Sequence, residues 1–284
     1  MTTNLPPDRY VKVGDVNTRY WSMGEQGSNL VMIHGLGGFA ETWVENVAAL
    51  AHRHRVYVLD LVGFGRSDKP PISYSIENLA LFLRDFMATQ EIENATLMGN
   101  SMGGAVALQF TLLHPEQVEA LVLVSSAGFG TGVPWMVRVA TMPVLGELLL
   151  RPTRRAAKWI MKGVLYDPDR IPDSVLDVGF ETLSTPPARR AILKTVRSMI
   201  RVHAGDMQAY ASLQEALSRL NTPTLIVWGS EDSVLPVEHA HIANQTLPNT
   251  ILQVYDRCGH MPQVERAEEF NALVLDFMAK LEGS

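Results

Sequence analysis

The sequence predicts an α/β domain: a mostly parallel sheet of the eight-stranded type, helices on both of its faces, and a helical cap inserted after the sixth strand. Short apolar runs alternate along the chain with segments of helical spacing. The runs are nearly continuous in apolar residues, which is typical of parallel strands buried on both faces. The alternation stops between positions 131 and 220, where only helical stretches broken by prolines are found.

The first half of the chain supplies most of the predicted sheet. Partial alternation of polar and apolar residues over Tyr10–Tyr20 indicates an antiparallel edge strand. Compact apolar runs predict buried strands at Leu30–Ile33, Arg55–Leu59, Ala95–Met98 and Ala120–Val124. Apolar residues at helical spacing predict helices at Tyr74–Gln90 and Gly104–Leu113.

Strands and helices alternate again near the C-terminus. Strands are predicted at Thr222–Trp228 and Thr250–Val254, and helices at Val237–Gln245 and Ala267–Lys280. We therefore expect a core domain formed by residues 1–130 and 206–284, with a cap formed by residues 131–205. Such a cap is expected over the carboxyl ends of the strands, where ligands collect in open α/β sheets.

Composition limits the possible partners and compartments. The chain has 284 residues, of which 46% are hydrophobic and 19% are charged, so it can bury a large core. Met1–Tyr10 lacks the apolar centre of a signal peptide, and no apolar run reaches the ~20 residues of a membrane helix. Cys258 is the single cysteine, which excludes an intrachain disulfide. We expect a cytoplasmic monomer or homodimer without stable membrane insertion.

The net charge of −6 is unevenly distributed. Residues 131–205 contain 12 Lys or Arg and 6 Asp or Glu, a net of +6, which leaves −12 for the remainder of the chain. The overall acidity argues against nucleic acid as a partner. The basic stretch is either a set of solvated helix faces or a positively charged lid over a site for anionic or interfacial substrates.

Ser101 lies in the sequence Gly99-Asn100-Ser101-Met102-Gly103, between a predicted strand and a predicted helix. A glycine two residues before and two after the serine fits a sharp strand-to-helix turn, where bulkier side chains would clash. Such a turn presents the hydroxyl clear of the backbone and at the positive end of the helix. A serine needs this exposure and a neighbouring base to act as a nucleophile.

Two other loops at strand ends supply the groups that could activate this serine. Asp232 follows the strand that ends at Trp228, and His260 follows the strand that ends at Val254. A carboxylate that orients a histidine, which in turn takes the serine proton, is the arrangement of a catalytic triad. Glu231 competes for the carboxylate role, and Asp232 is preferred because an apolar run that can anchor it follows.

A glycine-rich loop, His34-Gly35-Leu36-Gly37-Gly38, follows the strand Leu30–Ile33. Its backbone N–H groups can approach a substrate closely, and we expect the N–H groups of Leu36 and Met102 to stabilise an oxyanion. The loop has the spacing of neither common phosphate-binding glycine motif. No cluster of His, Cys and carboxylate residues at metal-ligand spacing is found, so neither a metal nor a cofactor is expected.

These motifs resemble the α/β-hydrolase fold superfamily over essentially residues 10–281. The resemblance is carried by H-G-x-G-x, D-x-x-G-x-G-x-S, G-N-S-M-G-G and G-H-x-P-x-x-E, which read here His34–Gly38, Asp60–Ser67, Gly99–Gly104 and Gly259–Glu265. It implies that Ser101, Asp232 and His260 are nucleophile, acid and base.

The resemblance leaves two principal activities open. One is hydrolysis of carboxylic esters, which we expect. The alternative is carbon–carbon bond hydrolysis of vinylogous diketone acids, as in the meta-cleavage product hydrolases, to which Gly-Asn-Ser at 99–101 and the basic cap are similar. That family usually has Trp after the catalytic histidine, where this chain has Met261. Perhydrolysis, acyl transfer and a receptor role on the same fold are further alternatives.

Substrate contacts are expected from residues near the triad. Gly37 and Asn100 are candidates, although Asn100 could equally serve only the local backbone. Phe129, Trp135 and Met136 either line an apolar acyl pocket or pack in the core. A substrate carboxylate would need a cation from the cap, for which three arginines are candidates: Arg189, Arg190 and Arg197.

Overall fold

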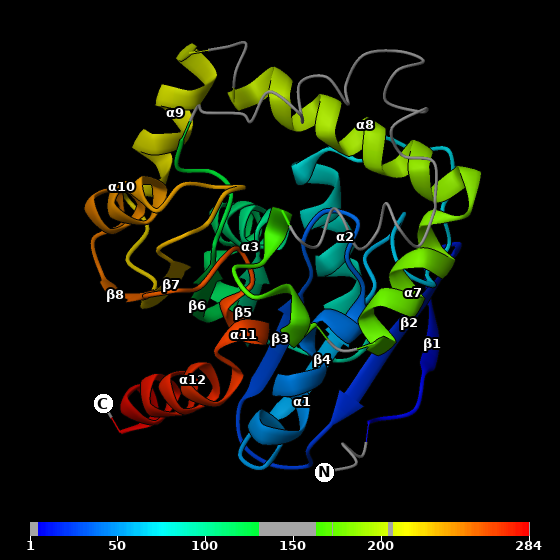
Figure 1. The fold of residues 1–284 in the computed structure, drawn as a ribbon, viewed down its shortest axis with the longest axis horizontal. Helices are drawn as coiled ribbons and strands as arrows, with labels where there is room; N and C mark the ends of the chain where they lie inside the picture. The colour runs from blue at the N-terminus through cyan, green and yellow to red at the C-terminus, as the bar shows by residue number, and fades with distance from the viewer. Residues whose placement is uncertain (1–4, 131–162, 172, 204–206, 284) are drawn as a thin grey trace.

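The computed structural model describes residues 5–130, 163–171, 173–203 and 207–283, and it confirms the predicted fold class (Figure 1). Eight strands form one sheet in the order β1-β2-β4-β3-β5-β6-β7-β8. The first two pair antiparallel, and β2 pairs antiparallel with β4, whereas the remaining pairs are parallel. Their bounds are β1 Arg9–Val13, β2 Val16–Met23, β3 Asn29–Ile33, β4 Arg55–Leu59, β5 Ala95–Asn100, β6 Val118–Val124, β7 Thr224–Gly229 and β8 Thr250–Tyr255.

The N-terminal strand differs from its prediction. The segment Tyr10–Tyr20 is not one strand but parts of two, β1 and β2, joined by the tight turn Gly14-Asp15. Gly14 has a φ of 56°, in the left-handed region that glycine enters without a steric penalty. Because polar and apolar residues alternate in places on both sides of the turn, the pattern alone did not separate the two strands.

Helices cover both faces of the sheet (Figure 1). Helices α2 (Ile76–Thr89), α3 (Met102–Leu113) and α10 (Glu238–Thr246) lie on one face. Helices α1 (Val44–Ala51), which was not predicted, and α12 (Ala267–Glu282) lie on the other. Three short helices complete these layers: η1 (Ala40–Trp43), η2 (Pro115–Gln117) and α11 (Pro262–Glu265).

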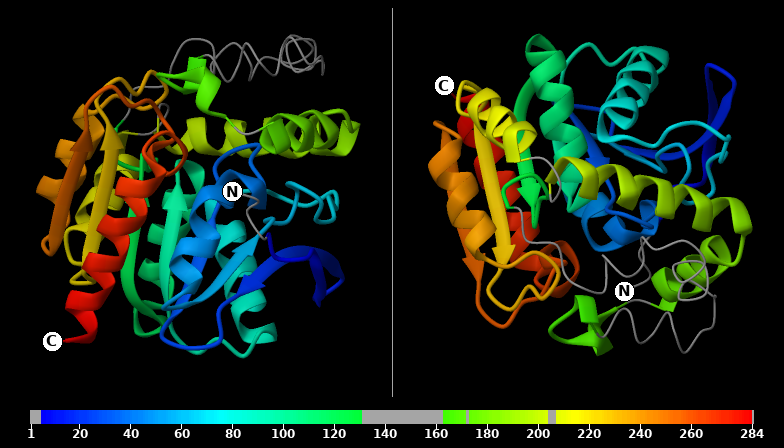
Figure 2. Two further views of the ribbon diagram at one scale, coloured as in Figure 1. Left: turned by 60° about the horizontal axis from the view of Figure 1, so that its bottom comes forward. Right: turned by 90° about the horizontal axis from the view of Figure 1, so that it is seen from above.

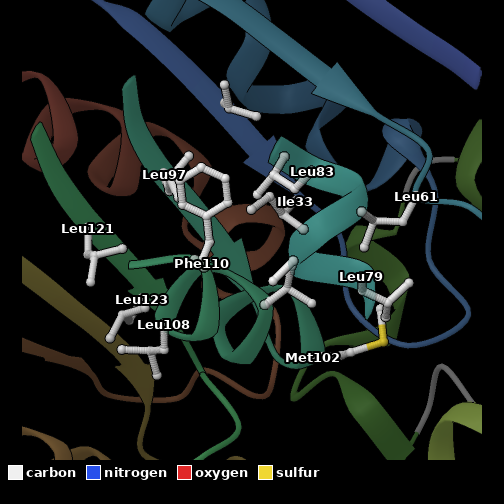
Figure 3. Packing of buried hydrophobic residues seen from close by; sticks show 14 of the residues in the cluster. Ile33, Leu61, Leu79, Leu83, Leu97, Met102, Leu108, Phe110, Leu121 and Leu123 are labelled. Atoms are coloured by element: carbon white, nitrogen blue, oxygen red, sulfur yellow. The ribbon is translucent and has the colours of Figure 1, made fainter. Parts of the chain in front are cut away.

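The core consists of one large apolar cluster on each side of the sheet. Strand β3 shows the division, because Val31 and Ile33 belong to the first cluster and Leu30 and Met32 to the second. Figure 3 shows part of the first cluster, in which side chains of α2 and α3 pack against the strands. A sheet packed from both sides holds the carboxyl ends of its strands in fixed positions, and the candidate site lies at those ends.

The described part of the insertion between β6 and β7 is helical. It contains η3 (Pro168–Arg170), α7 (Asp173–Leu183), α8 (Pro186–His203) and α9 (Met207–Leu217). Figure 2 shows α7 and α8 lying across one end of the sheet. Lys194 Nζ on α8 donates a hydrogen bond to the carbonyl of Ile72, on the loop before α2, at 3.1 Å. Among the described helices, none has both the length and the hydropathy required to span a bilayer.

Candidate active site

Ser101 occupies a strained turn directly between β5 and α3. Its φ of 56° and ψ of −117° lie outside the regions that most side chains favour. The turn is so tight that a Cβ placed on Gly99 would lie 2.3 Å from the carbonyl carbon of Gly103. A Cβ on Gly103 would lie 2.2 Å from the carbonyl oxygen of Ile33. The glycines on either side of Ser101 are therefore required by close backbone contacts.

Asp232 and His260 meet at the ends of β7 and β8. His260 Nδ1 lies 2.7 Å from Asp232 Oδ2, and both side chains are buried. The other carboxylate oxygen, Oδ1, accepts hydrogen bonds from the backbone N–H groups of Val234 and Leu235, each at 2.9 Å. Because the carboxylate accepts from Nδ1–H, the ring Nε2 is left as the proton acceptor. His260 and Ser101 line the same cavity.

Glu231, the competing carboxylate, has a different environment. Its Oε2 accepts a hydrogen bond from the backbone N–H of Cys258 at 2.9 Å, and its side chain is exposed. Hydrogen bonds from Ser230 and from the backbone lower the pKa of Glu231. The structure thus places Asp232, and not Glu231, against the histidine ring.

Two buried side chains, His34 and Asp60, form hydrogen bonds that fix the glycine-rich loop after β3. His34 Nε2 accepts a hydrogen bond from Leu61 N–H at 3.1 Å, so its Nδ1 carries the proton donated to the carbonyl of Gly35 at 2.7 Å. Burial lowers the pKa of His34, which favours this neutral form. Asp60 accepts from the backbone N–H groups of Ala40 and Arg66, each at 2.7 Å. These hydrogen bonds within the protein hold the loop in place.

Leu36 and Met102, whose backbone N–H groups are expected to donate to an oxyanion, are placed differently relative to the cavity over Ser101. Leu36 lines the cavity itself. The side chain of Met102 is buried in the core, but this residue is the first of α3. The first N–H groups of a helix have no partner within it, so they are available to an external acceptor.

A cavity of about 250 Å³ lies over Ser101 and His260. Loops at the carboxyl ends of β3, β5 and β8 form its floor, and one face of α7 forms a wall. The helix contributes Val175, Leu176, Gly179 and Leu183. Among the described lining residues there is no Lys, Arg, Asp or Glu. The described surroundings of Ser101 are therefore apolar apart from the polar groups of the loops.

The predicted substrate contacts have different outcomes. Gly37 and Asn100 line the cavity. Asn100 Nδ2 also donates to the carbonyls of Val124 at 3.1 Å and His260 at 3.2 Å, so its amide joins the serine turn to the histidine loop. Phe129 is fully buried in the core and is not among the lining residues, which favours its packing interpretation over a contact with substrate. Trp135 and Met136 lie outside the described residues.

The three candidate arginines of the insertion do not line the cavity. Arg189 donates hydrogen bonds from Nη1 to the carbonyls of Leu183 and Ser184, at 3.1 and 3.0 Å, and so caps the end of α7. Arg190 is exposed. In the described ranges, no group of three or more His, Cys, Asp and Glu side chains is arranged to hold a metal ion.

Sequence reasoning missed a buried ionic cluster beside the site. Arg19 on β2 is fully buried and contacts Glu41 through two hydrogen bonds of 2.7 and 2.9 Å. Its guanidinium also donates to Asp60 at 3.2 Å and to Asp8 at 2.9 Å. These carboxylates raise the pKa of Arg19 above its already high value. The only signal in the sequence was an arginine within a strand, since its partners come from distant segments.

Comparisons with known proteins identify the family of the fold. The sequence model of the alpha/beta hydrolase fold family matches residues 29–267. The chain is 30% identical to 2-hydroxy-6-oxo-6-(2'-aminophenyl)hexa-2,4-dienoic acid hydrolase of Metapseudomonas resinovorans, over 96% of this chain and 91% of that protein.

Two solved structures are also similar. A membrane phospholipase A, a bacterial virulence factor, has a TM-score of 0.81 and 27% identity, over 98% of this chain and 87% of that one. A serine hydrolase involved in carbazole degradation has a TM-score of 0.81 and 28% identity, over 96% of this chain and 98% of that one. The names of these similar proteins thus include both a phospholipase and a dienoic acid hydrolase.

Proposed function

The chain belongs to the α/β-hydrolase fold family, and we propose that it is a serine hydrolase that cleaves carboxylic esters with uncharged, apolar acyl groups. The proposal assigns Ser101 as nucleophile, His260 as general base and Asp232 as the carboxylate that orients the histidine. It assigns the backbone N–H groups of Leu36 and Met102 to the oxyanion.

The proposed reaction has two steps of the same chemical form. His260 Nε2 takes the proton of Ser101 Oγ as this oxygen attacks the acyl carbon, and the two backbone N–H groups stabilise the negative charge on the carbonyl oxygen. The ester C–O bond then breaks, and the alcohol leaves with the proton from His260. Water attacks the acyl-enzyme with the same assistance, which releases the acid and restores Ser101. Asp232 stabilises the imidazolium in both steps.

The observation that carries the ester assignment is the character of the cavity. Its described wall on α7 is aliphatic, and none of the described lining residues is a lysine or an arginine that could pair with a substrate carboxylate. Burying an unpaired carboxylate there would be costly, whereas an apolar acyl group would be stabilised by leaving water. The similarity to a phospholipase A structure, with 27% identity, supports an acyl ester as substrate.

We further propose that residues 131–205 form a cap, with the remainder as the core domain. The wall that α7 contributes to the cavity supports this role for the cap. Helix α9, which begins after the proposed boundary, hydrogen-bonds to the core through Gln214 Nε2 and the carbonyl of Gly128 at 2.8 Å. Leu217 of this helix belongs to the first apolar cluster, as do Ala191 and Ile192 of α8, so the hydrogen bond of Gln214 carries the assignment of α9 to the core domain.

A second candidate is carbon–carbon bond hydrolysis of a meta-cleavage product. It is favoured by the 30% identity to the hexadienoic acid hydrolase from Metapseudomonas resinovorans. It is also favoured by Asn100, which lines the cavity directly before Ser101. Such a substrate carries a carboxylate, so this reading requires a cation that the described lining residues do not supply.

The two candidates are separated by comparing two substrates with one enzyme preparation. We expect the purified protein to hydrolyse short p-nitrophenyl esters with a higher kcat/KM than the coloured dienolate of a ring-cleavage product. Ser101→Ala should remove the ester activity, which shows that the turnover belongs to this site. Efficient loss of the dienolate colour, with only trace ester hydrolysis, would transfer the assignment to the second candidate.

A further inference from the structure

Glu265 is a buried carboxylate that the proposed chemistry does not use. It ends the short helix α11, and only 2% of its surface is exposed. Its Oε1 accepts a hydrogen bond from the backbone N–H of Gly259 at 2.8 Å. Its Oε2 accepts from the N–H groups of Tyr166 at 2.8 Å and Asp167 at 3.0 Å. One carboxylate thus joins the residue before His260 to the helical insertion.

The segment of the insertion that Glu265 contacts, residues 163–170, lies directly on the histidine loop. The backbone N–H of His260 donates to the carbonyl of Val164 at 2.8 Å. Arg170 Nη1 donates to the carbonyl of Glu265 at 2.9 Å. A Cβ on Gly259 would lie only 2.6 Å from the Tyr166 nitrogen. The backbone of the histidine loop therefore packs so closely against that of residues 163–170 that only glycine fits at position 259.

The electrostatics make this carboxylate difficult to replace. Burial raises the pKa of Glu265, and the three backbone N–H groups oppose that shift by favouring the charged form. Asp167 is the nearby acidic group, and it raises the same pKa further. Hydrogen bonds to a charge in a desolvated site are strong, and an isosteric amide would turn its NH2 group toward backbone donors.

We propose that Glu265 is a positioning residue, which clamps the loop of His260 onto residues 163–167 and thereby fixes the histidine ring for reaction with Ser101. The backbone of His260 is held by this clamp, while its ring is held by Asp232. Val164 is both an acceptor for His260 N–H and part of the cavity wall. The position of the His260 ring therefore depends on how residues 163–167 pack against the histidine loop. It rests on the proposed function only for the role of His260.

Glu265→Gln is the direct test. We expect kcat to fall on the order of 10²-fold, as for a small displacement of a reacting group, with KM little changed because the wall of the cavity remains. We also expect the low-field NMR signal of the His260 Nδ1 proton, which reports its hydrogen bond to Asp232, to shift or broaden. Glu269→Gln is the matched control, because Glu269 pairs with Arg266 on the exposed side of α12. This control should leave both measurements unchanged.

Arg170→Met provides a second test that does not disturb the buried carboxylate. It removes the hydrogen bond to the Glu265 carbonyl and the exposed ion pair between Arg170 and Asp167, and it should lower kcat in the same direction but less. If Glu265→Gln does not fold, kcat and the His260 Nδ1 proton signal of Arg170→Met test the proposed clamp instead.

The proposal that Glu265 positions His260 would be overturned if the folded Glu265→Gln protein kept the parental kcat and NMR signal. When Glu265→Gln does not fold, the same result in Arg170→Met would overturn it. The NMR signal does not depend on which reaction is catalysed. Failure of the proposed ester activity would therefore leave the test of the clamp intact.

Discussion

Replacing Asp232 with Asn is expected to lower kcat by about 10⁴-fold, the loss that accompanies a wrong histidine tautomer in a catalytic triad. The reason lies in the partners of the carboxylate. Oδ1 accepts from the N–H groups of Val234 and Leu235, and only an oxygen can occupy that position. The asparagine NH2 must therefore face His260 Nδ1, which lies 2.7 Å from Oδ2 in the parent. Nδ1 then accepts a hydrogen bond from the asparagine, and the ring proton moves to Nε2. Nε2 can then no longer accept the proton of Ser101.

This prediction is checked by steady-state kinetics on the best p-nitrophenyl ester, with circular dichroism to show that the fold is kept. Glu231→Gln is the control, since its amide oxygen can still accept from the N–H of Cys258. We expect this control to keep most of its activity. Equal losses in the two variants would contradict the assignment of Asp232.

Arg19→Met is expected to produce the largest loss of stability, about 3–5 kcal/mol of the free energy of unfolding. The substitution keeps a long side chain but removes the charge that three carboxylates surround. Asp60 is buried and would lose its ion pair, and the buried Glu41 would keep only Arg66 as a partner, at 3.3 Å. Such a loss is a large part of the 5–15 kcal/mol by which native domains are stable.

Urea unfolding followed by tryptophan fluorescence measures this effect, and the midpoint should move to lower denaturant with a similar slope. Arg9→Met on β1 is the matched control, because Arg9 is exposed and lies opposite Tyr20 in the same hairpin. It should leave the midpoint nearly unchanged. A small effect at Arg19 would show that the buried cluster contributes little to the stability of the fold.

Much of the fold follows from the sequence because parallel strands leave a local signal. The runs that became β3 to β7 are mainly apolar, since both faces of the sheet are covered, whereas the edge strand β8 contains Gln253 and is only partly buried. The carboxyl ends of parallel strands share one edge, so the segments after β5, β7 and β8 were expected to converge there. The contact between Asp232 and His260 agrees with that expectation.

Other features had no local signal. The turn at Gly14 interrupts a pattern that continues on its other side, so the pattern predicts one strand where the structure has two. The burial of Phe129 depends on which side of the chain meets the core, which the residue type does not determine. Arg19 and Glu265 find their partners in segments far away along the chain, and only the folded structure brings these groups together.

Mass spectrometry after reaction with a fluorophosphonate probe shows whether His260 makes Ser101 nucleophilic. We expect one adduct per chain, located on the peptide that contains Ser101, together with its loss in Ser101→Ala and strong slowing in His260→Ala. An unmodified Ser101 in active protein, or unchanged labelling when this serine is replaced, would contradict this expectation.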